Sequence, residues 1–150
     1  MKTVYLLIVL APLLGAILAG LAGQRLGRQA SAALTVAAVG VSALLSLWVL
    51  YQHATGGAPV FNETIYRWAT AGGLNLEVGF LVDRLTALMM VVVTSVSFAV
   101  HVYTIGYMHD DAGCQRFFSY INLFTFAMLM LVMANNFLQL FFGWEAVGLV

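Results

Sequence analysis

The chain alternates long apolar runs with short polar turns. Four of the runs contain no Asp, Glu, Lys or Arg, at residues 4–22, 30–51, 85–108 and 117–134. Each run is about long enough to cross the hydrocarbon core of a bilayer as a helix, which takes about 20 residues. A fifth apolar run follows Asn135 and Asn136 and continues to the last residue. We therefore predict an all-α membrane protein, a polytopic transmembrane helix bundle with four full spans and a fifth begun.

Residues 53–82 form the one long polar stretch. Gly56, Gly57 and Pro59 break helix at its start, and β-prone residues follow on both sides of Gly72 and Gly73. This pattern predicts a small β-hairpin. The chain then divides into an N-terminal helical hairpin (1–52), an extracytoplasmic loop or hairpin (53–82), helices three and four (83–134) and the truncated start of helix five (135–150).

In the first two apolar runs, charged residues indicate the orientation in the membrane and small residues indicate close helix packing. Arg25 and Arg28 lie in the turn between them, which favours a cytoplasmic turn and places the N-terminus and residues 53–82 outside. Gly15, Ala19 and Gly23 recur every four residues, a spacing that suits close helix packing in lipid. A basic start before an apolar run is also typical of a signal peptide, but the short turn to the next run favours a helical hairpin.

Composition agrees with a membrane location and excludes several functions. The chain is 63% hydrophobic and only 8% charged, with a mean hydropathy of +0.98, against about 25% charged residues in soluble domains. The formal net charge is zero and there is no basic run, so nucleic acid is not an expected partner. No metal-ligand constellation, glycine-rich nucleotide loop or nucleophile with a base is visible. The single cysteine, Cys114, is expected to be a solvated, reduced thiol in a loop.

Glu145 is the one carboxylate inside an apolar run. It lies nine positions after Asn136, so a helix that enters the membrane at Asn136 carries Glu145 roughly 13 Å deeper, close to the middle of the bilayer. A carboxylate there must be protonated, paired with a cation or hydrated. If a cation approaches and leaves, the proton affinity of the carboxylate changes and it can pass a proton on. The alternative, of equal weight from position alone, is a carboxyl that holds a neighbouring helix by a hydrogen bond.

The third run carries a polar face and an N-terminal capping signal. Thr94, Ser97, His101 and Thr104 are spaced three, four and three residues apart and share one side of a helix. Hydrogen bonding between helices is the favoured interpretation of His101, and a proton relay is the sharper alternative, since histidine titrates near neutral pH. Asp83 precedes the run and is expected to cap the helix.

Several stretches together resemble the antiporter-like membrane subunits of respiratory complex I, the subunit L or chain 5 family. The similar stretches are Leu81-Val82-Asp83-Arg84-Leu85-Thr86, His101-Val102-Tyr103, Gly106-Tyr107-Met108, Arg116-Phe117-Phe118-Ser119-Tyr120 and the run from Ala134-Asn135-Asn136 through Gly143-Trp144-Glu145 to Leu149. Ala146 departs from the pattern, because the family commonly has glycine there.

The resemblance implies a proton-translocating channel subunit of an NADH:quinone oxidoreductase. Glu145 would be its proton-translocating carboxylate, its lysine partner would lie on a later, broken helix, and His101 matches the third-helix pattern. The chain itself would hold no cofactor, since NADH, FMN, the iron–sulfur clusters and quinone belong to partner subunits. Its partners would be the bilayer and other complex I membrane subunits, especially the adjacent antiporter-like one. The location would be the bacterial inner membrane or the mitochondrial inner membrane.

Three interpretations stay open at this point. Besides a complex I subunit, the Trp-Glu pair is compatible with an Mrp-type cation/proton antiporter or a membrane-bound hydrogenase subunit. A non-catalytic membrane scaffold would use Glu145 only for packing. Because the fifth run has fourteen residues and stops without a polar flank, we expect the sequence to be the N-terminal piece of a longer protein.

Overall fold

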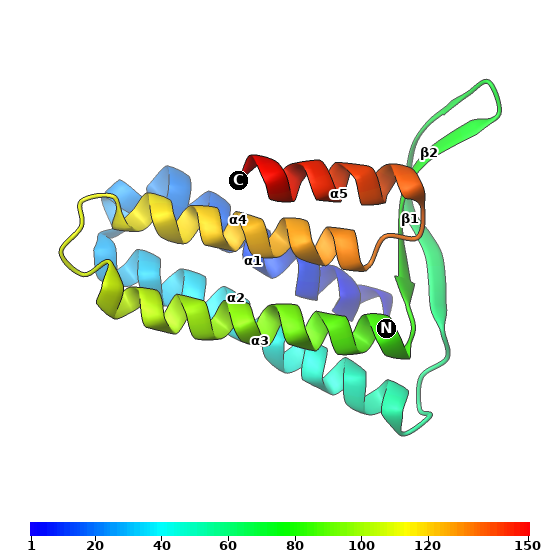
Figure 1. The fold of residues 1–150 in the computed structure, drawn as a ribbon, viewed down its shortest axis with the longest axis horizontal. Helices are drawn as coiled ribbons and strands as arrows, with labels where there is room; N and C mark the ends of the chain where they lie inside the picture. The colour runs from blue at the N-terminus through cyan, green and yellow to red at the C-terminus, as the bar shows by residue number, and fades with distance from the viewer.

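The computed structural model describes residues 1–150, except for the side chains of Gln24, Ala71 and Leu74. Five helices lie side by side, and a two-stranded antiparallel hairpin stands across one end of them (Figure 1). The elements in order are α1 (Lys2–Leu26), α2 (Arg28–Ala54), β1 (Phe61–Ala71), β2 (Leu74–Val82), α3 (Arg84–Tyr107), α4 (Cys114–Val132) and α5 (Phe137–Leu149).

Four of the helices have the length and apolar composition of membrane spans. They are α1, α2, α3 and α4, whereas α5 is a shorter apolar helix. The N-terminus lies at the hairpin end, and α5 begins there and ends partway along α4 (Figure 1). The predicted all-α membrane bundle with a small hairpin is confirmed.

Helix α4 is the central element of the bundle. It packs against α1, α2, α3 and α5, whereas α5 packs, within the described residues, only against α4 and β2. Small residues let α1 approach α4 closely: a Cβ added at Gly15 would lie 2.8 Å from the Asn122 amide nitrogen, and one at Gly20 would lie 2.8 Å from the Ser119 hydroxyl. The Ser119 hydroxyl donates to the Ala16 carbonyl at 2.7 Å, which adds an interhelical hydrogen bond at this contact.

The hairpin turns at two glycines and covers the end of the bundle. Gly72 and Gly73 have φ of +57° and +87°, the left-handed backbone that a two-residue hairpin turn of type I′ requires at both central positions. Where the strands reach the helices, Phe80 and Val82 join Tyr5 and Met133 in a buried apolar cluster. The hairpin is therefore attached to the bundle by its base, and its tip extends beyond the helices (Figure 1).

Asp83 caps α3 as predicted. Its carboxylate accepts a hydrogen bond from the Thr86 backbone N–H at 2.7 Å. This hydrogen bond stabilises the charged form and lowers the pKa of the Asp83 carboxyl below its usual value.

Two residues lie in other surroundings than the sequence suggested. His53 was placed in the polar stretch, but α2 continues to Ala54 and buries the His53 ring. Cys114, expected to be solvated, is the first residue of α4 and is buried against Ala32 and Phe118. For Cys114, residues of α2 and α4 cover the side chain, which the local polarity of the sequence does not reveal.

Candidate functional site

The turn between α4 and α5 positions the helix that carries Glu145. Asn136 is the N-cap of α5, and its side-chain oxygen accepts a hydrogen bond from the Gln139 backbone N–H at 2.8 Å. The amide nitrogen of the same side chain donates to the Glu77 carbonyl of β2 at 3.0 Å. One side chain thus starts the helix and links it to the hairpin.

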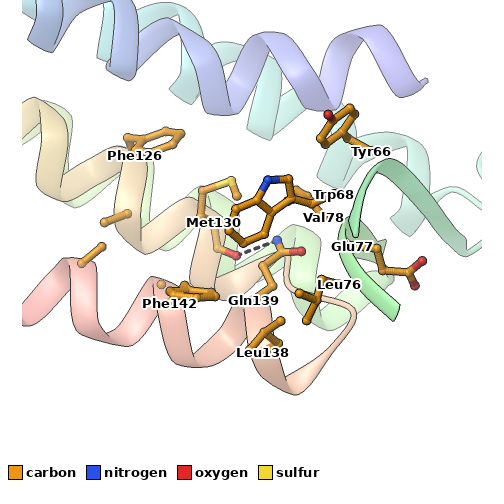
Figure 2. Close-up of a pocket in the computed structure, with 13 residues that line it drawn as sticks. Tyr66, Trp68, Leu76, Glu77, Val78, Phe126, Met130, Leu138, Gln139 and Phe142 are labelled. Carbon is orange, nitrogen blue, oxygen red and sulfur yellow. Dashed lines mark hydrogen bonds between the residues drawn. The ribbon is translucent and has the colours of Figure 1, made fainter. Parts of the chain in front are cut away.

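Gln139 forms a second connection one turn further on. Its side chain is buried, accepts from the Gly79 backbone N–H at 2.9 Å and donates to the Met130 carbonyl at 3.3 Å. Figure 2 shows the bond from Gln139 to Met130, below Trp68. Because Gly79 lies in β2 and Met130 in α4, Gln139 connects α5 to both of its neighbours.

The rotation of α5 turns Glu145 away from α4. Gly143 lies four residues after Gln139 and on the same side, and a Cβ added there would lie 3.0 Å from the Cα of Leu131. Glu145 follows Gly143 by two residues, a rotation of roughly 200°, and its side chain is exposed. No ion pair among the described residues includes Glu145. The carboxylate therefore faces the side of α5 on which no described element packs.

His101 lies in a buried polar cluster between α3 and α4. Its Nδ1 is 2.8 Å from the Ser97 carbonyl and therefore carries a proton and donates, because the carbonyl can only accept. The Ser97 hydroxyl is 2.6 Å from the Thr125 hydroxyl of α4. The predicted polar face of α3 thus meets polar groups of α4.

The other ring nitrogen of His101 leaves a second hydrogen-bonding position. Within the described part of the chain, His101 Nε2 and both amide atoms of Asn122 are buried without a hydrogen-bond partner, although Asn122 is a neighbour of the ring. In the neutral ring Nε2 is an acceptor, so it can take a proton or a hydrogen bond from an amide or a water. A proton relay through His101 would need hydrogen-bonding positions that are open in this way. The hydrogen bond that the structure shows between the two helices, however, joins Ser97 to Thr125.

The structure does not bring Glu145 and His101 together. No contact joins α3 and α5 within the described residues, and Glu145 faces away from the helix that His101 packs against. Sequence reasoning missed the role of Gln139 and the position of Asn122 beside the His101 ring. Each is a polar residue within an apolar run, and that local contrast was the signal available for both.

An apolar groove of about 520 Å³ lies between the hairpin, α4 and α5. Figure 2 shows Trp68, Met130 and Phe142 among its lining side chains, with the Gln139 amide at one side. Among the described residues, no group of three or more His, Cys, Asp or Glu could hold a metal ion. The groove has the chemistry of a packing surface.

These features define the class of protein: a multi-pass membrane helix bundle whose fifth helix carries one carboxylate deep in an apolar run. Residues 68–118 match the family profile described as the N-terminus of NADH-ubiquinone oxidoreductase (complex I) chain 5. This match, together with the relatives described next, confirms the resemblance to the subunit L or chain 5 family of complex I that was drawn from the sequence.

Two relatives and one solved structure illustrate the match. NADH-quinone oxidoreductase subunit L of Neisseria meningitidis serogroup A is 60% identical over 149 residues, which is 99% of this chain and 22% of that protein. NADH-ubiquinone oxidoreductase chain 5 of Arabidopsis thaliana is 47% identical over 145 residues, with 97% and 22% covered.

The solved structure of a membrane-bound sulfane sulfur reductase, an archaeal respiratory membrane complex, shares the fold. Its TM-score is 0.67 at 17% identity, over 95% of this chain and 21% of that one. The chain thus spans about a fifth of the length of the curated relatives it matches.

Proposed function

We propose that this chain forms the first helices of a proton-translocating, antiporter-like membrane subunit of a complex I-type NADH:quinone oxidoreductase. The similarity to subunit L along 99% of the chain carries the proposal. In this role the chain moves protons and performs no redox chemistry, and NADH, FMN, iron–sulfur clusters and quinone bind partner subunits. Other membrane subunits of the complex, the adjacent antiporter-like one above all, are its partners.

Glu145 is the proton-carrying group in this proposal. Its depth supports the role, because α5 starts at the hairpin end and Glu145 lies near the end of that helix, partway along the bundle (Figure 1). Its direction supports it as well, since the side chain leaves the α4–α5 contact and is free to meet a cationic side chain from another part of the protein. Deep in a bilayer such a cation would decide whether the carboxylate is charged.

His101 has the weaker case for a role in proton transfer. Its ring lies on α3, and the hydrogen bond to the Ser97 carbonyl occupies one of its two nitrogens. That bond lies within α3, and Ser97 in turn joins α3 to α4 through the Thr125 hydroxyl, so a structural role accounts for both contacts. We therefore assign His101 to a structural cluster and propose proton relay only as its alternative function.

The substitution Glu145→Gln tests the proposal in the full-length chain within its native membrane complex. The variant keeps the size of the side chain and removes its ability to bind and release a proton, so proton pumping should fall at least about tenfold, a barrier change of about 1.4 kcal/mol, while complex content stays normal. Pumping is measured in inside-out vesicles, and complex content by quantifying the assembled enzyme.

The matched control is Glu63→Gln, which removes an exposed carboxylate of β1 and should leave pumping unchanged. Normal pumping by the Glu145 variant contradicts the proposal. A loss of assembled complex with normal turnover per complex would instead favour the scaffold interpretation, in which Glu145 only holds helices together.

A further inference from the structure

One side chain, Asn136, makes two different kinds of contact at the start of α5. Its oxygen caps the helix by accepting from the Gln139 N–H at 2.8 Å. Its nitrogen donates to the Glu77 carbonyl at 3.0 Å and to the Asn135 side-chain oxygen at 2.9 Å. Capping alone requires only an acceptor oxygen, which serine or aspartate also provides. The hydrogen bonds that the Asn136 nitrogen donates are therefore not needed for capping. The bond to Glu77 links α5 to the hairpin.

Neighbouring contacts restrict how α5 can move against the hairpin. The Asn135 amide donates to the Asn62 side chain of β1 at 3.2 Å, and the Leu81 N–H donates to the Met133 carbonyl at 2.9 Å. Gly79 lies so close that a Cβ there would collide with the Asn135 side chain. With the bonds of Gln139 to Gly79 and Met130, these contacts fix the depth of α5 and its rotation about its own axis.

Depth and rotation of α5 decide where Glu145 stands. The first turn is tied to the hairpin, and Gly143 seats the middle of the helix on Leu131. A rotation of one residue, about 100°, would turn Glu145 from its open side toward the α4 contact, and a shift of one residue would change its depth by about 1.5 Å. The proton affinity of a carboxylate in a low-dielectric site responds steeply to such changes in its distance from a cation.

We propose that Asn136 is a positioning residue for Glu145, acting through the bond from its amide nitrogen to the Glu77 carbonyl. The hairpin thereby becomes part of the machinery that sets the proton affinity of the carboxylate. This inference rests on the proposed function of Glu145 and adds to it the group that holds the carboxylate in place.

The substitution Asn136→Ser separates the two contacts, because a serine hydroxyl caps a helix but is too short to replace the amide nitrogen. The measurement is the ratio of protons pumped to electrons transferred, followed from pH 5.5 to pH 9 in vesicles containing the full-length complex, at equal complex content. We expect the midpoint of this pH profile to move by about half a unit or more. A purely structural role would lower the amount of complex and leave the shape of the profile unchanged.

The control Phe137→Leu alters the next residue, whose side chain is 89% exposed and takes no part in these bonds, and should keep the wild-type profile. If Asn136→Ser does not assemble, Asn136→Asp, a strong cap that lacks the amide donors, is measured in the same way. A wild-type profile in the assembled variant overturns the inference, whether its complex content is normal or reduced. Glu145→Gln run in parallel tests the proposed function separately, since normal pumping by that variant would remove Glu145 itself from proton transfer.

Discussion

At the scale of single residues, Asp83 shows how a side chain fixes the start of a membrane helix. Its carboxylate bonds to the Thr86 N–H at the positive end of α3, and this bond lowers the pKa of Asp83. The folded pKa is therefore below the unfolded value of about 3.9. The stabilising contribution is fully present above that unfolded value and is lost as the pH falls through the folded pKa.

The prediction for Asp83 follows from this sign. Asp83→Ala should destabilise the protein by about 1 kcal/mol near pH 7, and the difference from wild type should shrink below about pH 4. The measurement is thermal unfolding of the purified complex at several pH values. Asp83→Asn, which keeps a capping oxygen, is the control and should be nearly as stable as wild type at pH 7. A difference between wild type and Asp83→Ala that grows toward low pH would contradict the assignment.

At the scale of elements, α5 approaches the backbone of α4 closely at Gly143. A Cβ added at Gly143 would lie 3.0 Å from the Cα and 3.1 Å from the backbone nitrogen of Leu131. These are backbone atoms of a packed helix, which cannot move aside as a flexible side chain can. We expect Gly143→Ala to push α5 away from α4 and to cost about 1–3 kcal/mol, the range for overpacking.

Gly148 provides the matched control for Gly143. It lies on the same helix, and a Cβ added there meets no described atom within 4 Å. In the full-length protein, complex content and thermal stability of Gly148→Ala should stay close to wild type while those of Gly143→Ala fall. Equal behaviour of the two variants would mean that the α4–α5 contact does not limit stability.

Local signals in the sequence were sufficient for most elements. Apolar runs gave the four long helices, and the position of Asp83 gave the cap of α3. Gly72 and Gly73 predicted the turn of the hairpin, because few residues other than glycine adopt a positive φ readily. These features depend on residues close together in the chain, so the sequence displays them directly.

Contacts between distant residues were beyond the reach of the same reasoning. The bond from Asn136 to Glu77 joins residues 59 positions apart, and the burial of Cys114 requires Ala32 from α2. From polarity alone, Asn136 was expected at the membrane–water interface and Cys114 in solvent. Glu145 was identified by its depth in an apolar run, but the direction of its side chain follows only from how Gln139 and Gly143 seat the helix.

At the scale of the whole molecule, the two ends of the bundle differ in chemistry. The end opposite the hairpin contains the α1–α2 turn and the α3–α4 loop, which Arg28 joins by donating to the His109 carbonyl at 2.9 Å (Figure 1). Arginine-rich turns favour the cytoplasmic or matrix side of a membrane. We propose that this end faces inward and that the hairpin and the N-terminus face outward.

Labelling of single cysteines tests this orientation. Thr70→Cys in the hairpin and Asp111→Cys in the α3–α4 loop both replace exposed residues, in a full-length chain whose other accessible cysteines are removed. A membrane-impermeant maleimide should label Thr70→Cys in right-side-out vesicles and Asp111→Cys only in inverted ones. The reverse pattern would invert the topology. Because α5 starts at the hairpin end, the reverse result would also mean that α5 enters the membrane from the inner face. The depth of Glu145 and its dependence on Asn136 would not change.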